Sequence, residues 1–244
     1  RPVRFGEVTG VIGIKAVHLT TAAERRTMPK AKDLYIDIGA SSRAAAEERV
    51  SLGDYGVFDS PVVEFGDGLI KAKAIDDRVG CAALLKLLEE QPPIDTWFCF
   101  TVQEEVGLRG AASMAYALDP DFALVLEGTT AAVLAEVTDG KAVCHVRGGV
   151  VLPFMDGATI YDAGLFELLR DACAKRGIAW QTKTRVSGGT DAGRIHKSKA
   201  GVRVCAAAAP VRYIHSPSSV AAVSDCEAVL AAARAFLEDL RGDD

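Results

Sequence analysis

The sequence predicts an α/β fold: a mixed sheet covered by helices, preceded by a small β-rich domain. From about Gly68 onward, apolar strand-like segments alternate with segments of helical periodicity. The first 66 residues differ in texture, being rich in glycine and β-branched residues. The chain has 244 residues, 49% of them hydrophobic, which is enough for one sizeable core and a smaller satellite domain. We therefore place a β-rich domain at 1–66 and the main domain at 67–244.

The β-rich domain is predicted to contain short strands and one short helix. The helix is expected at Ser42–Val50, with Ser41 or Ser42 as N-cap, because a serine hydroxyl can accept a hydrogen bond from a free backbone N–H group. The strand candidates are Val8–Ile14, Leu34–Ile38 and Val62–Phe65.

The main domain is predicted as strands alternating with helices. Gly177 should end its third helix, and Ser224 with Glu227 has the spacing of a capping box at the start of its last helix. The strand candidates are Ile70–Ile75, Thr96–Val102, Phe122–Leu126, Ala142–Val146, Ala179–Thr184 and Val202–Ala206. The helix candidates are Asp76–Glu90, Gly107–Leu118, Tyr161–Arg176 and the segment that follows Ser224. Such alternation indicates a sheet with helices on both faces.

Composition excludes several classes of partner and compartment. The net charge is −5 and the charges are mixed along the chain, which argues against nucleic acid or anionic membrane as a partner. No apolar run approaches the roughly 20 residues that span a bilayer. The six cysteines are widely spaced without a CxxC pair, so reduced core thiols in a cytoplasmic protein are expected rather than a zinc ribbon or disulfide scaffold.

Acidic residues and a histidine follow four apolar strand candidates, at the strand ends where α/β sheets bind ligands. They are the pair Asp76 and Asp77, the pair Glu104 and Glu105, then Glu127, and lastly His215. Each has a structural alternative: one aspartate could cap a helix, the glutamates could occupy a helix N-terminus, and the histidine could make an ordinary polar contact. Together they would concentrate negative charge that cations must neutralise. Carboxylates with imidazole and no thiolate suit zinc, cobalt or manganese.

At these residues and a few others the chain resembles the dinuclear metallo-aminopeptidases of the tetrahedral, deblocking and glutamyl aminopeptidase type. The resemblance covers essentially the whole chain. Its most specific parts are the Glu-Glu segment and the Arg-Tyr-x-His-Ser-Pro segment. The matching segments are Val8–Gly13, Asp37–Ala40, Asp76–Gly80, Gln103–Ala111, Gly188–Ala192 and Arg212–Pro217. The resemblance implies a zinc-aminopeptidase-like catalytic domain at 67–244 and a dimerisation-type domain at 1–66.

The resemblance also implies a role for each site residue. Asp76 would bridge two divalent ions, and Glu105 and His215 would complete the first metal site. Glu127, where the family usually has aspartate, would bind the second ion. Glu104 would be the general base that takes a proton from the metal-bound water.

The implied reaction is hydrolysis of the N-terminal amino acid from a peptide. Two divalent ions would serve it, with zinc expected and cobalt or manganese as alternatives. The glycine-containing loop should line the substrate pocket, since glycine permits close backbone approach. Its residues are Gly188, Gly189, Thr190 and Asp191. The family forms large hollow homo-oligomers, so a homo-oligomer is expected here too.

One family feature is absent from the sequence. The family's remaining ligand is a histidine in a His-x-Asp segment, and none of His18, His145 and His196 lies in one. We therefore expect the chain to lack its N-terminal part, leaving strand edges unpaired and core exposed. One alternative is a truncated or degenerate, non-catalytic relative. An endoglucanase is a second alternative, since paired carboxylates also hydrolyse glycosidic bonds. Two observations disfavour it: the adjacent glutamates cannot flank a sugar bond, and tryptophan is scarce.

Overall fold

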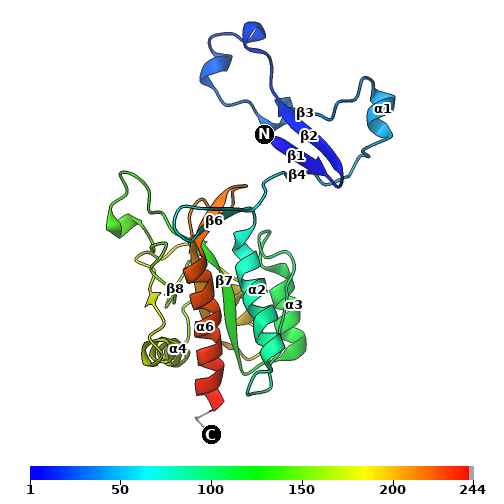
Figure 1. Cartoon of the computed structure of the whole chain (residues 1–244). Helices are drawn as coiled ribbons and strands as arrows, with labels where there is room; N and C mark the ends of the chain where they lie inside the picture. The colour runs from blue at the N-terminus through cyan, green and yellow to red at the C-terminus, as the bar shows by residue number, and fades with distance from the viewer. Residues whose placement is uncertain (242–244) are drawn as a thin grey trace. The chain divides into compact units, whose positions relative to one another are not determined.

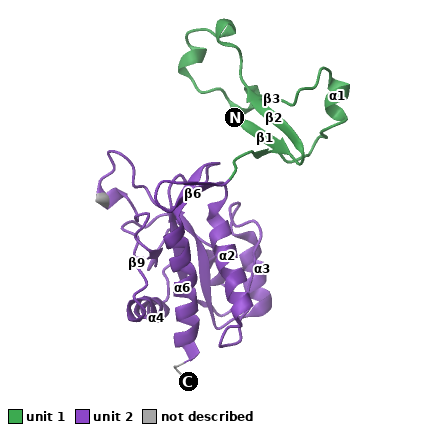
Figure 2. Cartoon of the chain, in the orientation of Figure 1, with its two compact units in different colours: residues 1–61 green, residues 62–244 purple. Residues whose placement is uncertain are grey.

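The computed structural model describes residues 1–241, apart from the side chain of residue 139. The chain folds as two compact units, Arg1–Pro61 and Val62–Asp244 (Figure 2). The first unit ends at Pro61, before the predicted domain boundary at residue 66, and so it does not contain the strand candidate Val62–Phe65. That strand candidate belongs to the second unit, because β5 (Val63–Phe65) pairs with β6 (Leu69–Ala72) there.

The first unit is built on a four-stranded antiparallel sheet in the order β3-β2-β1-β4. The helix α1 (Arg43–Glu47) begins after Ser42, whose hydroxyl accepts a hydrogen bond from the Ala45 N–H at 3.2 Å, as predicted. The strands are β1 (Pro2–Phe5), β2 (Val8–Gly13), β3 (Tyr35–Asp37) and β4 (Val57–Phe58). Short 3₁₀ turns lie at Val17–Leu19, Glu24–Arg26 and Ala31–Asp33.

The second unit contains two sheets. The larger has the order β7-β10-β8-β9 and is mixed, since β10 runs parallel to β7 and antiparallel to β8. The smaller, in the order β11-β6-β5, is antiparallel. The remaining strands are β7 (Phe122–Thr130), β8 (Val150–Val151), β9 (Trp180–Gln181), β10 (Arg203–Val211) and β11 (Ser219–Ala222).

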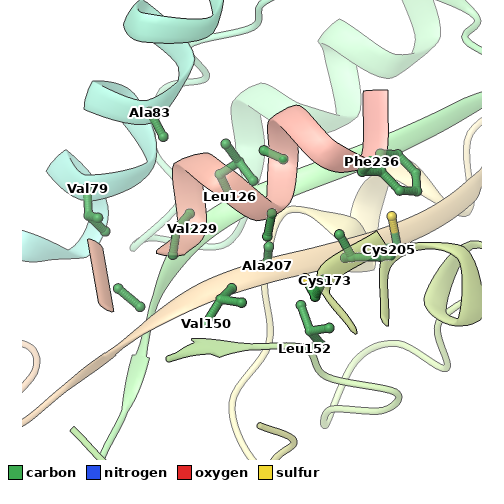
Figure 3. Packing of buried hydrophobic residues seen from close by; sticks show 14 of the residues in the cluster. Val79, Ala83, Leu126, Val150, Leu152, Cys173, Cys205, Ala207, Val229 and Phe236 are labelled. Carbon is green, nitrogen blue, oxygen red and sulfur yellow. The ribbon is translucent and has the colours of Figure 1, made fainter. Parts of the chain in front are cut away.

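Helices cover both faces of the larger sheet (Figure 1). Alternate residues of β10 point to opposite faces: Cys205 and Ala207 pack with α2, α4 and α6, whereas Val204 and Ala206 pack with α3 and α5. Figure 3 shows the first layer, where Phe236 and Val229 of α6 lie over the sheet. The helices are α2 (Ile75–Glu90), α3 (Arg109–Leu118), α4 (Ala163–Lys175), α5 (Ala192–Ile195) and α6 (Val223–Leu240). The predicted mixed sheet with helices on both faces is confirmed.

Two strand predictions are wrong. Thr96–Val102 is not a strand, and no described strand pairs with it; its Trp97 is 73% exposed. Among the described strands β7 pairs with β10 alone, so one edge of β7 is open there. Ala142–Val146 is a tight turn instead, because Val143 adopts a left-handed φ of +66° and the Cys144 N–H bonds back to the Ala142 carbonyl.

The structure agrees with the predicted end of α4 but not with the predicted start of α6. Gly177 stands just beyond α4 with a φ of +65°, which fits the predicted stop. The predicted capping box at Ser224 is wrong, since α6 begins after Ala222 and has no side-chain cap. No described helix is long and apolar enough to cross a membrane.

Candidate metal centre

Three of the predicted site residues meet at one point of the second unit. The His215 Nε2 atom lies 3.5 Å from Asp76 Oδ2 and 3.3 Å from Glu105 Oε2. All three donor atoms lie within 4.8 Å of one another. Two donors bound about 2.1 Å from a tetrahedral zinc ion would stand about 3.4 Å apart, so the observed separations suit a shared divalent ion. Two carboxylates and one imidazole are also a donor set that zinc accepts.

Asp76 reaches this point because its neighbour takes over the capping of α2. The Asp77 Oδ1 atom accepts a hydrogen bond from the Gly80 N–H at 2.8 Å, the geometry of an N-cap. Asp76 has non-helical φ and ψ angles and turns toward β7, where its Oδ1 accepts from the Gly128 N–H at 3.2 Å. A Cβ atom at Gly128 would stand 2.9 Å from the Asp76 Cβ, so this approach requires glycine.

The backbone is strained beside each of the three donors. Ala74, Gln103 and His215 have φ angles of +53°, +61° and +59°, in the left-handed region that side chains other than glycine, asparagine and aspartate rarely adopt. Such conformations cost free energy and gather at functional sites, where the surrounding structure enforces them. The same region of φ is also adopted away from the cluster, for example by Gln91 and Lys199, so these angles do not mark the cluster by themselves.

The adjacent residues Glu104 and Glu105 lie in different surroundings. Glu105 is exposed and joins the donor cluster, while Glu104 is half-buried beside it. Burial, and after it the carboxylates of Asp191, Glu105 and Asp76, raise the pKa of Glu104 to about 7 against the opposing effect of His215. A carboxyl with a pKa near neutrality can exchange protons with water, as a general base must.

Burial also raises the pKa of Asp76, and the Gly128 N–H opposes that rise. Glu105 adds to it and His215 again opposes it. Crowded carboxylates of this kind favour a bound cation, because a cation stabilises all of their ionised forms at once.

Glu127 lies outside the three-donor cluster described above. It is partly buried in β7, beside Ala208 of β10 in the strand register. Burial raises the pKa of Glu127 well above its usual value, the ammonium of Lys183 opposes that rise, and Asp76 adds to it. Lys183 itself is only 7% exposed. This lysine was not predicted from the sequence, although its place within the predicted strand Ala179–Thr184 was a signal for a buried charge.

The predicted substrate loop is held by a buried polar network. Thr190 and Asp191 are buried, and the Thr101 hydroxyl donates to Asp191 Oδ2 at 2.5 Å. The buried Tyr161 hydroxyl donates to Asp156 Oδ2 at 2.7 Å and lies 3.3 Å from Thr190 Oγ1. These contacts fix the loop beside Glu104. Tyr161 and Asp156 were not identified from the sequence, because neither belongs to a short motif.

The ends of the loop are held by its backbone. The Gly188 carbonyl accepts from the Gly157 N–H at 2.9 Å, and Gly188 has a φ of +73°. Gly189 follows, and a Cβ there would stand 3.2 Å from the Ala158 Cβ. The loop is therefore packed against the segment that follows β8.

A cleft of about 810 Å³ opens beside these groups. One part of its wall carries the carboxylates of Asp76, Glu104 and Glu127, and another is apolar, with Phe98 and Leu124. The acidic residues thus share this cleft with apolar ones, a common character of ligand sites.

The other histidines lie elsewhere. His196 caps α5, with its Nδ1 atom 2.7 Å from the Ala192 carbonyl, and the three-donor cluster contains neither it nor His18 or His145.

Comparisons with known proteins identify the family of the chain. Residues 3–231 match the family model of the M42 glutamyl aminopeptidases. The chain is 36% identical to a putative aminopeptidase of Acetivibrio thermocellus over 218 residues, which cover 88% of this chain and 64% of that protein. It therefore spans somewhat less than two thirds of the length of that relative.

Solved structures of peptidases are also similar to this chain. The aminopeptidase APDkam598 of Desulfurococcus kamchatkensis superimposes with a TM-score of 0.89 at 35% identity, covering 97% of this chain and 67% of that one. The Pyrococcus horikoshii TET1 peptidase, described as able to assemble into a tetrahedron or a large octahedral shell, has a TM-score of 0.79 at 27% identity, with coverage of 96% and 70%.

One similar structure carries a different description. A Thermotoga maritima protein described as an endoglucanase has a TM-score of 0.77 at 31% identity, covering 98% of this chain and 68% of that one. The match to the M42 model extends over nearly all of the chain, including the donor cluster. The chain therefore belongs to the M42 glutamyl aminopeptidase family.

Proposed function

We propose that this chain carries the catalytic centre of a metal-dependent aminopeptidase, which removes N-terminal amino acids from peptides. The observation that carries the proposal is the convergence of Asp76, Glu105 and His215 at distances that suit one divalent ion. Family membership supports the reaction class. The function of a relative is not transferred by fold alone, so the donor geometry is the stronger support.

Asp76, Glu105 and His215 would hold the first ion, with zinc favoured and cobalt or manganese as alternatives. Asp76 and Glu127 would contribute to a second, as the family resemblance implies. When bound, such ions supply Lewis acidity, which polarises the peptide carbonyl and makes water more acidic.

Glu104 would carry the proton that hydrolysis transfers from the water to the leaving amine. As general base it accepts a proton from the attacking water, and as general acid it returns that proton to the leaving amine when the peptide bond breaks. Its half-buried position beside three other carboxylates supports this role, because those neighbours strengthen its affinity for a proton.

The loop Gly188–Asp191 would line the substrate pocket. Its buried hydrogen bonds to Tyr161 and Thr101 support this, since a fixed loop can orient a peptide. The acidic residues around the cluster would attract the positively charged α-amine of a peptide.

The proposal extends to assembly and location. The likeness to the Pyrococcus horikoshii peptidase supports a homo-oligomer. The six cysteines are all unpaired in the structure, which supports a reducing compartment and hence the cytoplasm.

The test compares two adjacent substitutions. Glu104→Gln should reduce turnover of a peptide with a free N-terminus by about 10²- to 10⁴-fold while bound zinc is retained. Glu105→Gln should lower the zinc content itself. Turnover is followed as release of the first amino acid, and zinc by elemental analysis after gel filtration. Loss of zinc in the Glu104 variant would show that the roles of the two glutamates are wrongly assigned.

Substrate controls separate the competing functions. A peptide with an acetylated N-terminus should be cleaved poorly, because its amine carries no charge. Hydrolysis of cellulose that persists in the presence of a chelator would favour the endoglucanase alternative. A metal-loaded protein without any peptidase activity would favour the non-catalytic alternative.

A further inference from the structure

The segment that carries His215 is a tight turn between the end of β10 at Val211 and the start of β11 at Ser219. The His215 side chain is 63% exposed, so packing restrains its imidazole little, and the place of the ring depends on the backbone of the turn. That backbone has left-handed φ angles of +55° at Tyr213 and +59° at His215, which side chains of these types rarely adopt. The surrounding structure therefore has to hold the turn in this shape.

Two sets of contacts fix the base of the turn. The Arg212 N–H donates to the Val220 carbonyl at 2.8 Å, and the Val220 N–H donates to the Arg212 carbonyl at 2.9 Å. Ile214 packs against the main hydrophobic cluster of the second unit. These contacts restrain the ends of the turn and one residue beside His215.

Ser219 restrains the turn from inside. It is the first residue of β11 and is 2% exposed. Its hydroxyl oxygen lies 3.1 Å from the Tyr213 carbonyl oxygen and 3.2 Å from the Ser216 carbonyl oxygen. A hydroxyl carries one hydrogen, so it donates to one of these acceptors or shares the hydrogen between both. The two acceptors flank His215 in the sequence, and Ser219 thus ties both flanks of this residue to β11.

We propose that Ser219 is a positioning residue of the metal centre, whose hydroxyl holds the turn in the shape that brings His215 Nε2 to Asp76 and Glu105. Ser219 does not itself contribute a donor to the ion. This inference rests on the metal centre of the proposed function. A serine with a purely structural role would change the stability of the metal-free chain and leave its affinity for a metal ion unchanged.

The test measures the zinc affinity of the chain by competition with a chelator, and the urea unfolding of the zinc-free chain alongside it. Ser219→Ala should weaken zinc binding by about tenfold or more, the usual effect of removing a group that orients a metal ligand. Unchanged zinc affinity in this variant would overturn the inference, whatever the urea midpoint does. If Ser219→Ala does not fold, Ser219→Cys is judged by the same criterion, because its thiol is a weaker hydrogen-bond donor.

A double-mutant cycle shows whether Ser219 acts through His215. In a His215→Ala background, Ser219→Ala should cause no further loss of zinc affinity, because the ligand that Ser219 positions is gone. A second loss as large as the first would overturn the inference.

Ser198 offers a matched control in the same unit. It is 9% exposed, and its hydroxyl has no hydrogen-bond partner among the described residues. Ser198→Ala should leave zinc affinity unchanged. A loss equal to that of Ser219→Ala would show that removing any buried hydroxyl disturbs the site, and would overturn the specific role of Ser219.

The outcome is distinguishable from failure of the proposed function. Absence of zinc binding by the wild-type chain would refute the metal centre itself. Zinc binding that depends on Ser219, in a chain without peptidase activity, would support the role of Ser219 and refute the aminopeptidase proposal.

Discussion

Removal of a single hydroxyl group tests whether the buried network stabilises the substrate loop. Tyr161 is 4% exposed, and its hydroxyl donates to the Asp156 carboxyl at 2.7 Å and approaches the Thr190 hydroxyl at 3.3 Å. Tyr161→Phe keeps the ring and its packing, so no cavity forms. A hydrogen bond to a carboxylate contributes about 1.5–3 kcal/mol, so we expect the free energy of unfolding to fall by about 2 kcal/mol.

The assay is urea unfolding followed by far-ultraviolet circular dichroism. The long helices α2, α4 and α6 all belong to the second unit, so the signal reports the unit that contains Tyr161. The slope against urea should not change, because the surface exposed on unfolding is the same.

Tyr116 offers a matched control in the same unit. It is 67% exposed, and its ring lies under the Lys199 ammonium at 5.0 Å, a contact that phenylalanine preserves. Tyr116→Phe should change the free energy of unfolding by less than about 0.5 kcal/mol. If the two variants lose equally little stability, the Asp156–Tyr161–Thr190 network does not stabilise the fold and the reasoning is wrong.

Two further substitutions test how distant segments support the site. Asp225→Ala should lower the free energy of unfolding by about 2–4 kcal/mol in the same urea assay. The buried Asp225 carboxylate accepts from the N–H groups of Arg147 and Gly149, and the substitution would leave both groups unsatisfied. A loss below about 1 kcal/mol would contradict this. Gly128→Ala should weaken zinc binding by about tenfold or more in calorimetry, because the new methyl group displaces Asp76. Unchanged affinity would show that Asp76 tolerates the shift.

The sequence by itself determined which residues have the chemistry of the site. The ends of apolar strand candidates singled out the pairs Asp76–Asp77 and Glu104–Glu105 together with Glu127 and His215. The family resemblance then selected Asp76, Glu105 and His215 as ligands of one ion. The alternating pattern also predicted the layered α/β architecture. These features are readable because hydrophobic period and residue type are local properties of the chain.

Tertiary structure decided which groups meet. Asp77 caps α2 and leaves Asp76 free for the cluster, a division that two adjacent aspartates do not reveal. Likewise Asp225, rather than Ser224, makes the important contacts at the start of α6, because its partners lie in a distant loop.

The same limit applies to Thr96–Val102 and Lys183. The apolar segment Thr96–Val102 satisfies every local criterion for a strand, but a strand requires a neighbour to complete its hydrogen bonds, and the described residues do not provide one. Lys183 looks like an ordinary strand lysine, but the fold leaves it only 7% exposed. Pairing across strands depends on how the whole sheet packs, and no local pattern records it.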